Sequence, residues 1–189
     1  MTSPKAAYDS SSVGLPLSRE EKSVSVPLLG VVMLLPRALD ARLQRETGHS
    51  LHEYQVLLWL SVSEGGRQHM TALAEAAHVT PSHLSRLAAR LERRGALKRL
   101  PSPDDARSVL AELTDTGRQL LAEAAPVYRA ALRQLVFDQL PESDMEGFGR
   151  LNDSVLAALR ANGTVPTAME PALGNGTKVD EAGSGAQRL

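Results

Sequence analysis

Two short helical patterns separated by a tight break constrain the fold of this chain more than any other feature. Leucine and alanine recur at helical spacing over 71–77, and His78–Val79 then break the pattern. Thr80 is a typical helix cap, and Pro81 stands at the first helical position, where its missing N–H is no loss. The helix that begins at Pro81 is expected to end at Gly95. Two helices joined by a tight turn predict a helix-turn-helix.

Two short β segments follow this pair of helices, at Ala96–Leu100 and Ser108–Leu113. The loop between them is dense in Pro, Asp and Ser, which favours turns over regular structure. A β-hairpin placed directly after a helix-turn-helix indicates a winged helix. We therefore expect a fold that is mainly α with a small β-hairpin wing, an α+β protein.

Helical periodicity also covers the flanking segments. A long first helix, which Pro36 can kink, is expected to end at Gly48, and Ser50 can cap a second, buried helix. Thr114 caps a fifth helix, and Ser143–Glu146 has the pattern of a capping box for a sixth. The apolar stripes of the first, fifth and sixth helices exceed what a small winged domain can cover. We expect an α-helical dimerisation region that buries them in a two-fold homodimer.

Composition indicates one globular domain between two tails. Of the 189 residues, 42% are hydrophobic and 23% are charged, which are globular values. The start of the chain shows no sustained period, and the last 27 residues hold five of the fourteen glycines. We expect a disordered N-terminal arm at 1–22, one domain at 23–162 and a disordered C-terminal tail at 163–189.

The sequence also disfavours several classes of function. It has no cysteine, which excludes disulfides, thiolate metal sites and thiol catalysis. It lacks a Gly-rich phosphate loop and the common hydrolase motifs, so we expect no enzymatic activity and no cofactor. The longest apolar run, Val26–Pro36, is interrupted by Pro27 and Gly30 and is shorter than the roughly 20 residues of a membrane span. With no signal-peptide pattern, a cytoplasmic protein without a membrane partner is expected.

Positive charge gathers in one window although the whole chain has a net charge of −1. From Arg86 to Arg107 there are seven basic and three acidic residues, an excess of four positive charges. The basic residues are Arg86, Arg90, Arg93, Arg94, Lys98, Arg99 and Arg107. Such a surface suits double-stranded DNA, because phosphate neutralisation and counterion release supply much of the affinity. A merely solvated helix face is the alternative.

The first turns of the helix after Thr80 carry polar side chains that its apolar face does not need. In a helix-turn-helix this end meets base edges, while flanking groups hold phosphates. Arg86 could pair with a guanine edge. Ser82, His83 or Ser85 could reach a base or a phosphate oxygen, and plain solvent exposure is the alternative for His83. Thr80 is primarily a cap, and its neighbouring N–H groups could also meet phosphate.

These patterns resemble the MarR family of bacterial transcriptional regulators. Leu73–Leu87 and Leu91–Gly95 look like the helix-turn-helix of the family. Asp105-Ala106-Arg107 followed by Leu113-Thr114-Asp115-Thr116-Gly117 matches its wing signature, Asp-x-Arg and then Leu-Thr-x-x-Gly. The resemblance spans about Leu28 to Leu159. It implies a sequence-specific DNA-binding homodimer, a ligand-responsive repressor of transcription that binds a pseudo-palindromic operator.

The resemblance also implies roles for regions and residues. It places a DNA-binding part at about 51–117 and dimerisation helices at about 25–47 and 115–162. The recognition helix would contribute Thr80, Ser82, His83, Ser85 and Arg86, followed by the basic Arg90 and Arg94. From the wing, Arg107 steadied by Asp105 would enter the minor groove, whose narrow electronegative shape suits a guanidinium. A wing-stiffening Asp105–Arg107 ion pair is the alternative.

Regulators that resemble this chain commonly release DNA when a small aromatic or anionic effector enters a cleft beside the dimerisation helices. Candidate residues for such a cleft are Met33, Arg37, His52, Tyr54 and Trp59, although apolar residues at helical spacing are more often core. His49, His52 and Glu53 are weak candidates for metal ligands, which leaves open a zinc-responsive repressor of the same fold. A helical interaction module that does not bind DNA is a further alternative.

Overall fold

The structure, a computed structural model, describes residues 17–103 and 108–162. The chain divides into two compact units, residues 1–37 and 38–189, with the boundary inside the first helix. The described residues are mainly helical and form one three-stranded antiparallel sheet. This confirms the expected fold class. The predicted C-terminal tail, 163–189, lies outside the described residues.

Helix α1 spans Arg19–Thr47 and begins earlier than the sequence pattern indicated. The Ser18 hydroxyl accepts a hydrogen bond from the N–H of Glu21 at 3.1 Å, and the Glu21 carboxylate accepts one from the N–H of Ser18 at 2.7 Å. This reciprocal capping box satisfies two backbone donors that the helix itself cannot. Residues 19–22 of the predicted arm are therefore helical.

The part of α1 in the first unit is apolar and exposed. The helix runs on through Pro27 and Gly30, and by length and composition alone it could cross a membrane. The expectation that no segment is long enough was therefore wrong, because it treated these residues as interruptions. The exposed large apolar side chains here are Val24, Val26, Leu28, Leu29, Val31, Val32, Met33 and Leu34.

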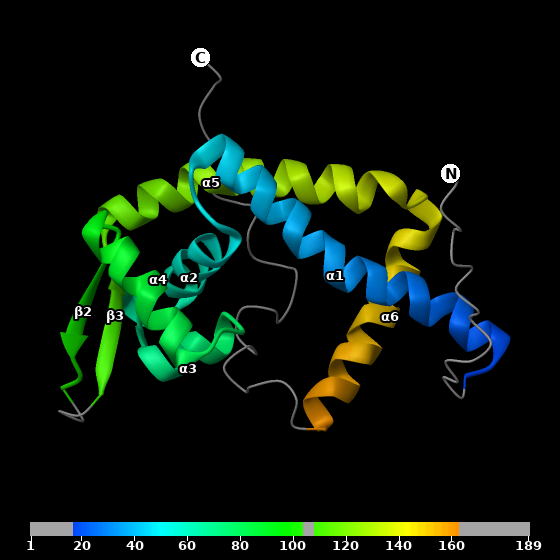
Figure 1. Ribbon diagram of the computed structural model, residues 1–189, viewed down its shortest axis with the longest axis horizontal. Coiled ribbons are helices and arrows are strands. Elements are labelled where there is room, and N and C mark those ends of the chain that lie inside the picture. Colours follow the sequence, from blue (N-terminus) through cyan, green and yellow to red (C-terminus); the bar gives the residue numbers. More distant parts are fainter. Residues whose placement is uncertain (1–16, 104–107, 163–189) are drawn as a thin grey trace, which may run out of the picture. The chain divides into compact units, whose positions relative to one another are not determined.

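The second unit contains the helix-turn-helix and the wing (Figure 1). Its helices are α2 (Leu51–Val62), α3 (Met70–Ala76) and α4 (Pro81–Arg93). Its strands are β1 (Arg67–His69), β2 (Leu97–Pro101) and β3 (Val109–Leu113), in the sheet order β1-β3-β2. The predicted hairpin is confirmed to within about one residue at each end of its strands.

Strand β1 was not predicted from the sequence. It follows a short 3-10 helix, η1 (Glu64–Gly66). It pairs antiparallel with β3 on the side away from β2, with Arg67 opposite Glu112 and His69 opposite Leu110. Three polar residues cannot show the alternation that identifies a half-buried strand. This segment is therefore extended because it pairs with β3, and its own residue pattern does not predict a strand.

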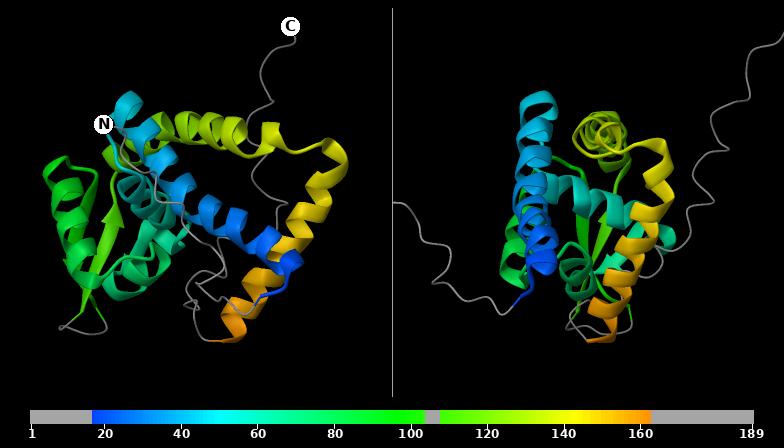
Figure 2. Two further views of the ribbon diagram at one scale, coloured as in Figure 1. Left: turned by 45° about the vertical axis from the view of Figure 1, so that its right-hand side comes forward. Right: turned by 90° about the vertical axis from the view of Figure 1, so that its right-hand side faces the viewer.

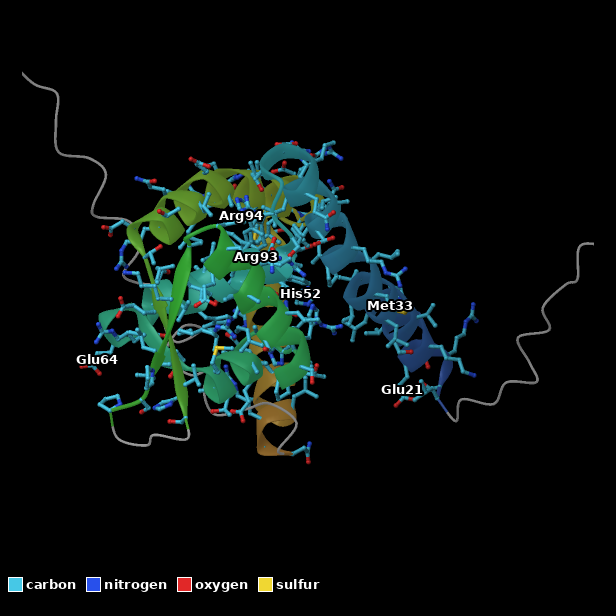
Figure 3. All side chains as sticks on the ribbon, turned by 60° about the vertical axis from the view of Figure 1, so that its left-hand side comes forward. Glu21, Met33, His52, Glu64, Arg93 and Arg94 are labelled. Carbon is cyan, nitrogen blue, oxygen red and sulfur yellow. The ribbon has the colours of Figure 1, made fainter. Side chains whose placement is uncertain are left out.

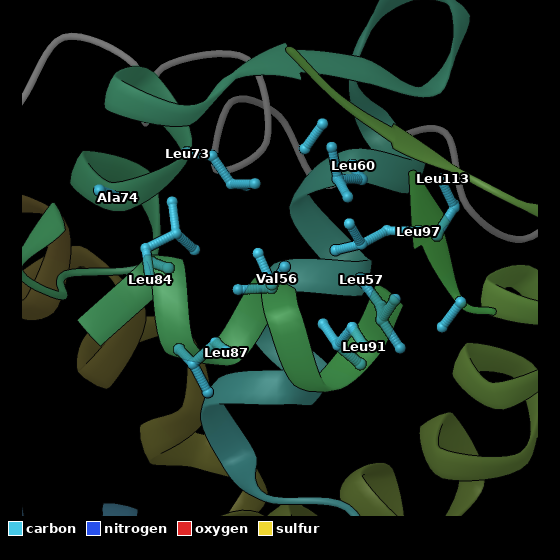
Figure 4. Close-up of a cluster of buried hydrophobic side chains, with 14 residues drawn as sticks. Val56, Leu57, Leu60, Leu73, Ala74, Leu84, Leu87, Leu91, Leu97 and Leu113 are labelled. Carbon is cyan, nitrogen blue, oxygen red and sulfur yellow. The ribbon is translucent and has the colours of Figure 1, made fainter. Parts of the chain in front are cut away.

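One hydrophobic core holds these elements together (Figure 4). Leucines from both helices of the helix-turn-helix, from α2 and from both strands of the hairpin meet in it. The fully buried leucines of this cluster include Leu57, Leu60, Leu73, Leu84, Leu87, Leu91, Leu97 and Leu113. Helix α4 therefore has one side fixed by burial, and the opposite side is left for solvent or a partner.

Helix ends in the winged part follow the predicted caps. Ser50, Thr80 and Thr114 each accept a hydrogen bond from the N–H three residues on, which confirms all three as N-caps. At the other end of α4, Gly95 adopts φ +70°, a left-handed conformation that glycine takes without strain.

Two helices complete the second unit (Figure 2). Helix α5 spans Asp115–Leu135, a 3-10 turn η2 covers Phe137–Gln139, and α6 spans Glu142–Ala161. The predicted capping box at Ser143–Glu146 was wrong. Pro141 occupies the N-cap position without a side-chain cap, and Ser143 lies inside the first turn, where its hydroxyl donates to Asp144.

Gly117, near the start of α5, packs tightly against Ala96 and Leu113. A Cβ atom at this position would lie 2.1 Å from the carbonyl oxygen of Ala96 and 2.6 Å from Cδ1 of Leu113. Only a residue without a side chain fits between α5 and the first residues after α4.

We expect Gly117→Ala to lower the free energy of unfolding by about 1 to 3 kcal/mol, the usual cost of overpacking. The matched control is Gly149→Ala in α6, where a Cβ meets nothing within 4 Å. Urea denaturation followed by circular dichroism, at one protomer concentration, measures both. Equal stability of Gly117→Ala and the wild type would contradict this close approach.

Candidate nucleic-acid interface

The N-terminal end of α4 is exposed, and its first turn is capped. The Thr80 hydroxyl accepts the N–H of His83 at 3.2 Å, and Pro81 follows at the first helical position. Before the helix, His78 takes φ 51°, which turns the chain sharply between α3 and α4. Ser82 and Ser85 are exposed. This end can therefore approach a ligand closely.

Basic residues continue along the exposed side of α4. Leu84, Leu87 and Leu91 are buried, whereas Arg86, Arg90, Arg93 and Arg94 are exposed. Figure 3 shows Arg93 and Arg94 together near one end of the helix. Arg86 makes no ion pair with any residue that the structure describes. The chain thus presents polar and cationic side chains on the face of α4 that its core leaves open.

Three contacts between polar side chains connect α2, or the second residue before it, to α4 or its C-cap, and together we call them the α2–α4 polar contact. The rings of His52 and His83 have centroids 5.2 Å apart. Arg90 Nε donates to Glu53 Oε1 at 3.0 Å. The terminal nitrogens of Arg94 lie 3.0 Å from Nδ1 and 3.3 Å from Nε2 of His49. Sequence reasoning missed these pairings, because their members lie 31 to 45 positions apart.

Three groups in this contact have shifted pKa values, and burial is the largest cause of the lowered pKa of His83. Burial lowers the pKa of His49, and the Arg94 charge lowers it further, against the opposing effects of Glu53 and Glu123. Burial alone would raise the pKa of Glu53. Hydrogen bonds from the Ser50 N–H and from Arg90 outweigh it and hold that pKa below its usual value. At neutral pH the structure therefore favours a neutral His49 beside an ionised Glu53.

The wing is attached to α4 by an ion pair that the sequence analysis did not identify. Arg99 on β2 donates to Glu92 Oε2 through Nε at 2.9 Å and through Nη2 at 2.6 Å. These bonds hold the pKa of Glu92 below its usual value. The N–H of Ser102 donates to the Ser108 carbonyl at 3.0 Å across the hairpin. Asp105 and Arg107, the predicted minor-groove residues, lie outside the described residues.

The candidate effector residues do not share one face of α2. Tyr54 is buried and stacks on Tyr128 of α5, with ring centroids 4.7 Å apart. Trp59 packs against the hydrophobic core and stands about 140° around the helix from Tyr54, at 100° per residue. His52 belongs to the α2–α4 polar contact, and Arg37 belongs to the first unit. An effector role for these four residues stays a prediction.

The structure does not gather His49, His52 and Glu53 into a metal site. Within residues 17–103 and 108–162, no group of three or more His, Asp or Glu side chains could hold a metal ion. Glu53 instead binds Ser50 and Arg90, and His49 lies against Arg94. The weak metal candidates are thus corrected to members of the α2–α4 polar contact.

Comparisons with known proteins agree on one family. The model of the MarR family matches residues 50–109. The crystal structure of Sco3205 from Streptomyces coelicolor, a MarR family transcriptional regulator in complex with DNA, is 37% identical to this chain, with a TM-score of 0.69. That match covers 76% of this chain and 89% of Sco3205.

Two further proteins are similar over shorter or more divergent stretches. CouR from Rhodococcus jostii RHA1, solved bound to p-coumaroyl-CoA, is 25% identical with a TM-score of 0.58, covering 70% of this chain and 90% of CouR. YhbI of Bacillus subtilis (strain 168), an uncharacterized HTH-type transcriptional regulator, is 29% identical over 101 residues. That alignment covers 53% of this chain and 65% of YhbI, a little less than two thirds of its length.

We expect the free energy of unfolding to fall as the pH drops below about 6.5, the ordinary pKa of histidine. Folding lowers the pKa of His49, so the unfolded chain binds the extra proton in this range, and stability is fully present only above it. Urea denaturation at several pH values should show a smaller loss in His49→Gln, which cannot titrate. His83, whose pKa is also lowered, is common to both proteins. Parallel pH profiles would count against this role of His49.

Proposed function

Because this chain belongs to the MarR family of transcriptional regulators, we propose that it binds double-stranded DNA as a ligand-responsive repressor of transcription. The single observation that carries the proposal is the exposed side of α4. This helix begins at a side-chain cap, presents Ser82, Ser85 and Arg86 at its free end, and continues with arginines. These residue types on an open helix start are those that read base edges and hold phosphates.

Helix α4 is the proposed recognition helix. Arg86 has the donors for a bidentate bond to guanine O6 and N7, and Ser82, His83 and Ser85 reach neighbouring base edges or phosphates. Arg90 and Arg94, further along, contact phosphates. From the wing, we propose that Arg107 with Asp105 enters the minor groove, an assignment supported by the sequence pattern alone.

We propose that the functional form is a homodimer. Helix α6 has 20 residues and buries none of them within the chain. Its exposed apolar side chains are Met145, Phe148, Leu151, Val155 and Leu159. A helix of this length gains most of its stability from packing an apolar face, so α6 needs a partner surface. A second copy would supply one and would give the two-fold symmetry of a pseudo-palindromic operator.

The apolar surface of α1 fits the same proposal. Val24 to Leu34 include eight exposed large apolar residues, more than a monomer in water normally leaves uncovered. Burial against a second copy removes this surface from water without a membrane. We therefore propose that the apolar length of α1 belongs to the dimer interface and that the protein is cytoplasmic. We also propose that it is a binding protein and not an enzyme.

The regulatory signal is proposed to be a small aromatic or anionic effector. CouR, a similar protein, was solved with the thioester p-coumaroyl-CoA, which has an aromatic and an anionic part. A zinc signal lacks support, since no group of candidate ligands forms among the described residues.

We expect the wild-type protein to select an inverted repeat from a library of random duplexes, with half-sites about 10 base pairs apart. Sequencing the bound fraction after several rounds measures this enrichment. Binding of the selected duplex should weaken steeply with salt, because phosphate contacts release counterions. A library that stays unenriched, with no salt-sensitive binding, would overturn the proposed function.

Arg86→Ala should weaken binding of the selected duplex by roughly 10- to 100-fold, the range expected for losing a bidentate base contact. Fluorescence anisotropy measures the affinity. The matched control is Arg118→Ala, which removes an exposed arginine from α5, where it packs beside Gly66 and Leu113 at the base of the sheet. If both variants lose the same affinity, Arg86 has no special place in readout.

Leu151→Asp should raise the dimer dissociation constant at least tenfold, because an apolar side chain that is 69% exposed in the single chain would be replaced by a charge at the interface. Sedimentation velocity over a range of protein concentrations measures it. Ala157→Asp is the control, about 180° around α6 from the apolar stripe. A monomeric wild type, or dimers equally stable in both variants, would contradict the proposed interface.

A further inference from the structure

The α2–α4 polar contact contains two of the three buried polar or charged residues of the described chain. His49 is 2% exposed and Glu53 is 5% exposed. Burying such groups is costly unless they are partnered, so these partners are integral to the fold. Both partners are arginines of the proposed recognition helix, Arg90 and Arg94.

Glu53 is held on both of its oxygens. Oε2 accepts the N–H of Ser50 at 3.0 Å in the capping box of α2, and Oε1 accepts Nε of Arg90 at 3.0 Å. Because Glu53 takes only Nε, the two terminal amino groups of Arg90 remain available beyond it. The Arg90 side chain is 45% exposed. A fixed carboxylate thus orients one edge of a guanidinium and leaves the other edge for a partner.

His49 holds the next arginine along the helix. Its two ring nitrogens lie 3.0 and 3.3 Å from the terminal nitrogens of Arg94, which always carries a positive charge. A neutral imidazole has a lone pair to offer this cation, whereas an imidazolium has none and repels it. The backbone N–H of His49 donates to the Thr47 hydroxyl at 3.2 Å, which ties the His49 backbone to the end of α1.

These two arginines continue a row that begins at the reading end of α4. Arg86, Arg90 and Arg94 follow each other at intervals of four residues, so they are neighbours that turn by about 40° per step around the helix. The turn carries the row from the open side of α4 toward α2, where Glu53 and His49 meet it.

We propose that Glu53 and His49 are positioning residues for DNA binding, which act by holding Arg90 and Arg94 toward the phosphates that flank the bases read by the start of α4. This inference rests on the proposed function and deepens it, because it names side chains that never touch DNA. The inference also predicts the sign of the change in DNA affinity when Glu53 is removed. Removing a carboxylate beside a DNA surface should strengthen binding by charge alone, whereas removing a positioning carboxylate weakens it.

The first test measures binding of the library-selected duplex by fluorescence anisotropy for Glu53→Ala, Arg90→Ala and the double variant. Active fractions are counted by stoichiometric titration, so that partial unfolding does not enter the affinity. We expect Glu53→Ala to bind roughly tenfold more weakly, the fold-change of a lost charge-assisted hydrogen bond, and to add no further loss in the Arg90→Ala background. Glu53→Gln keeps one acceptor oxygen in place of two and cannot make both bonds, so it should bind more weakly than the wild type.

The matched control is Glu75→Ala, which removes an exposed carboxylate from α3 that makes no ion pair among the described residues. It should bind as tightly as the wild type or more tightly. Additive losses in the double variant, or a Glu53→Ala protein that binds as well as Glu75→Ala, would overturn the positioning role of Glu53. A wild type that selects no duplex would overturn the proposed function, and the positioning with it.

The second test follows affinity from about pH 7.5 to about pH 5.5 in the wild type and in His49→Gln, whose amide oxygen accepts from Arg94 at every pH. The charged groups that face His49 are Arg94 on α4, Glu53 on α2 and Glu123 on α5. His52 and His83 are present in both proteins, so the ratio of the two proteins' affinities isolates His49. We expect the wild type to lose at least tenfold relative to His49→Gln at the acid end. A constant ratio would overturn the positioning role of His49.

Discussion

Burial of the leucine side of α4 is the constraint on which the rest of the winged part depends. Leu84, Leu87 and Leu91 fill the core between α2 and the sheet, and this fixes the rotation of the helix about its own axis. Once that rotation is set, the direction of every other side chain on α4 follows from 100° per residue. The serines at its start and the arginines along it face outward because the leucines face inward. The chemistry of the surface is therefore a consequence of packing.

Local signals explain why much of this fold could be predicted from the sequence. Ser50, Thr80 and Thr114 act as caps through bonds to residues three positions away, and such bonds are visible in any short window of sequence. Strand β1 escaped prediction because its only reason to be extended is β3, about 40 positions later. The early start of α1 at the Ser18–Glu21 capping box was overlooked although its signal is local, since charge and serine there were read as disorder.

The candidate site divides in the same way. Which residues stand at the free end of α4 was predictable, because helical spacing alone assigns them. Which carboxylate meets which arginine was not, because the pairs Glu53–Arg90 and Glu92–Arg99 form through tertiary packing. For the same reason, the spacing of His49, His52 and Glu53 suggested that they could bind one metal ion together. In the fold these side chains meet three different partners on α4, and what looked like a metal motif is part of a protein contact.

The arginines of α4 illustrate how one fold can use the same charge for stability and for binding. An arginine that pairs fully within the chain is stabilising but offers little to a phosphate, and one with no partner is available but must be ordered on binding at an entropic cost. Arg90 is intermediate: its Nε is held by a buried carboxylate while its terminal amino groups are not used by that bond. Part of the ordering is therefore completed during folding. Preorganisation of this kind raises affinity without adding any contact to DNA, which is why residues beneath a binding surface can matter as much as those on it.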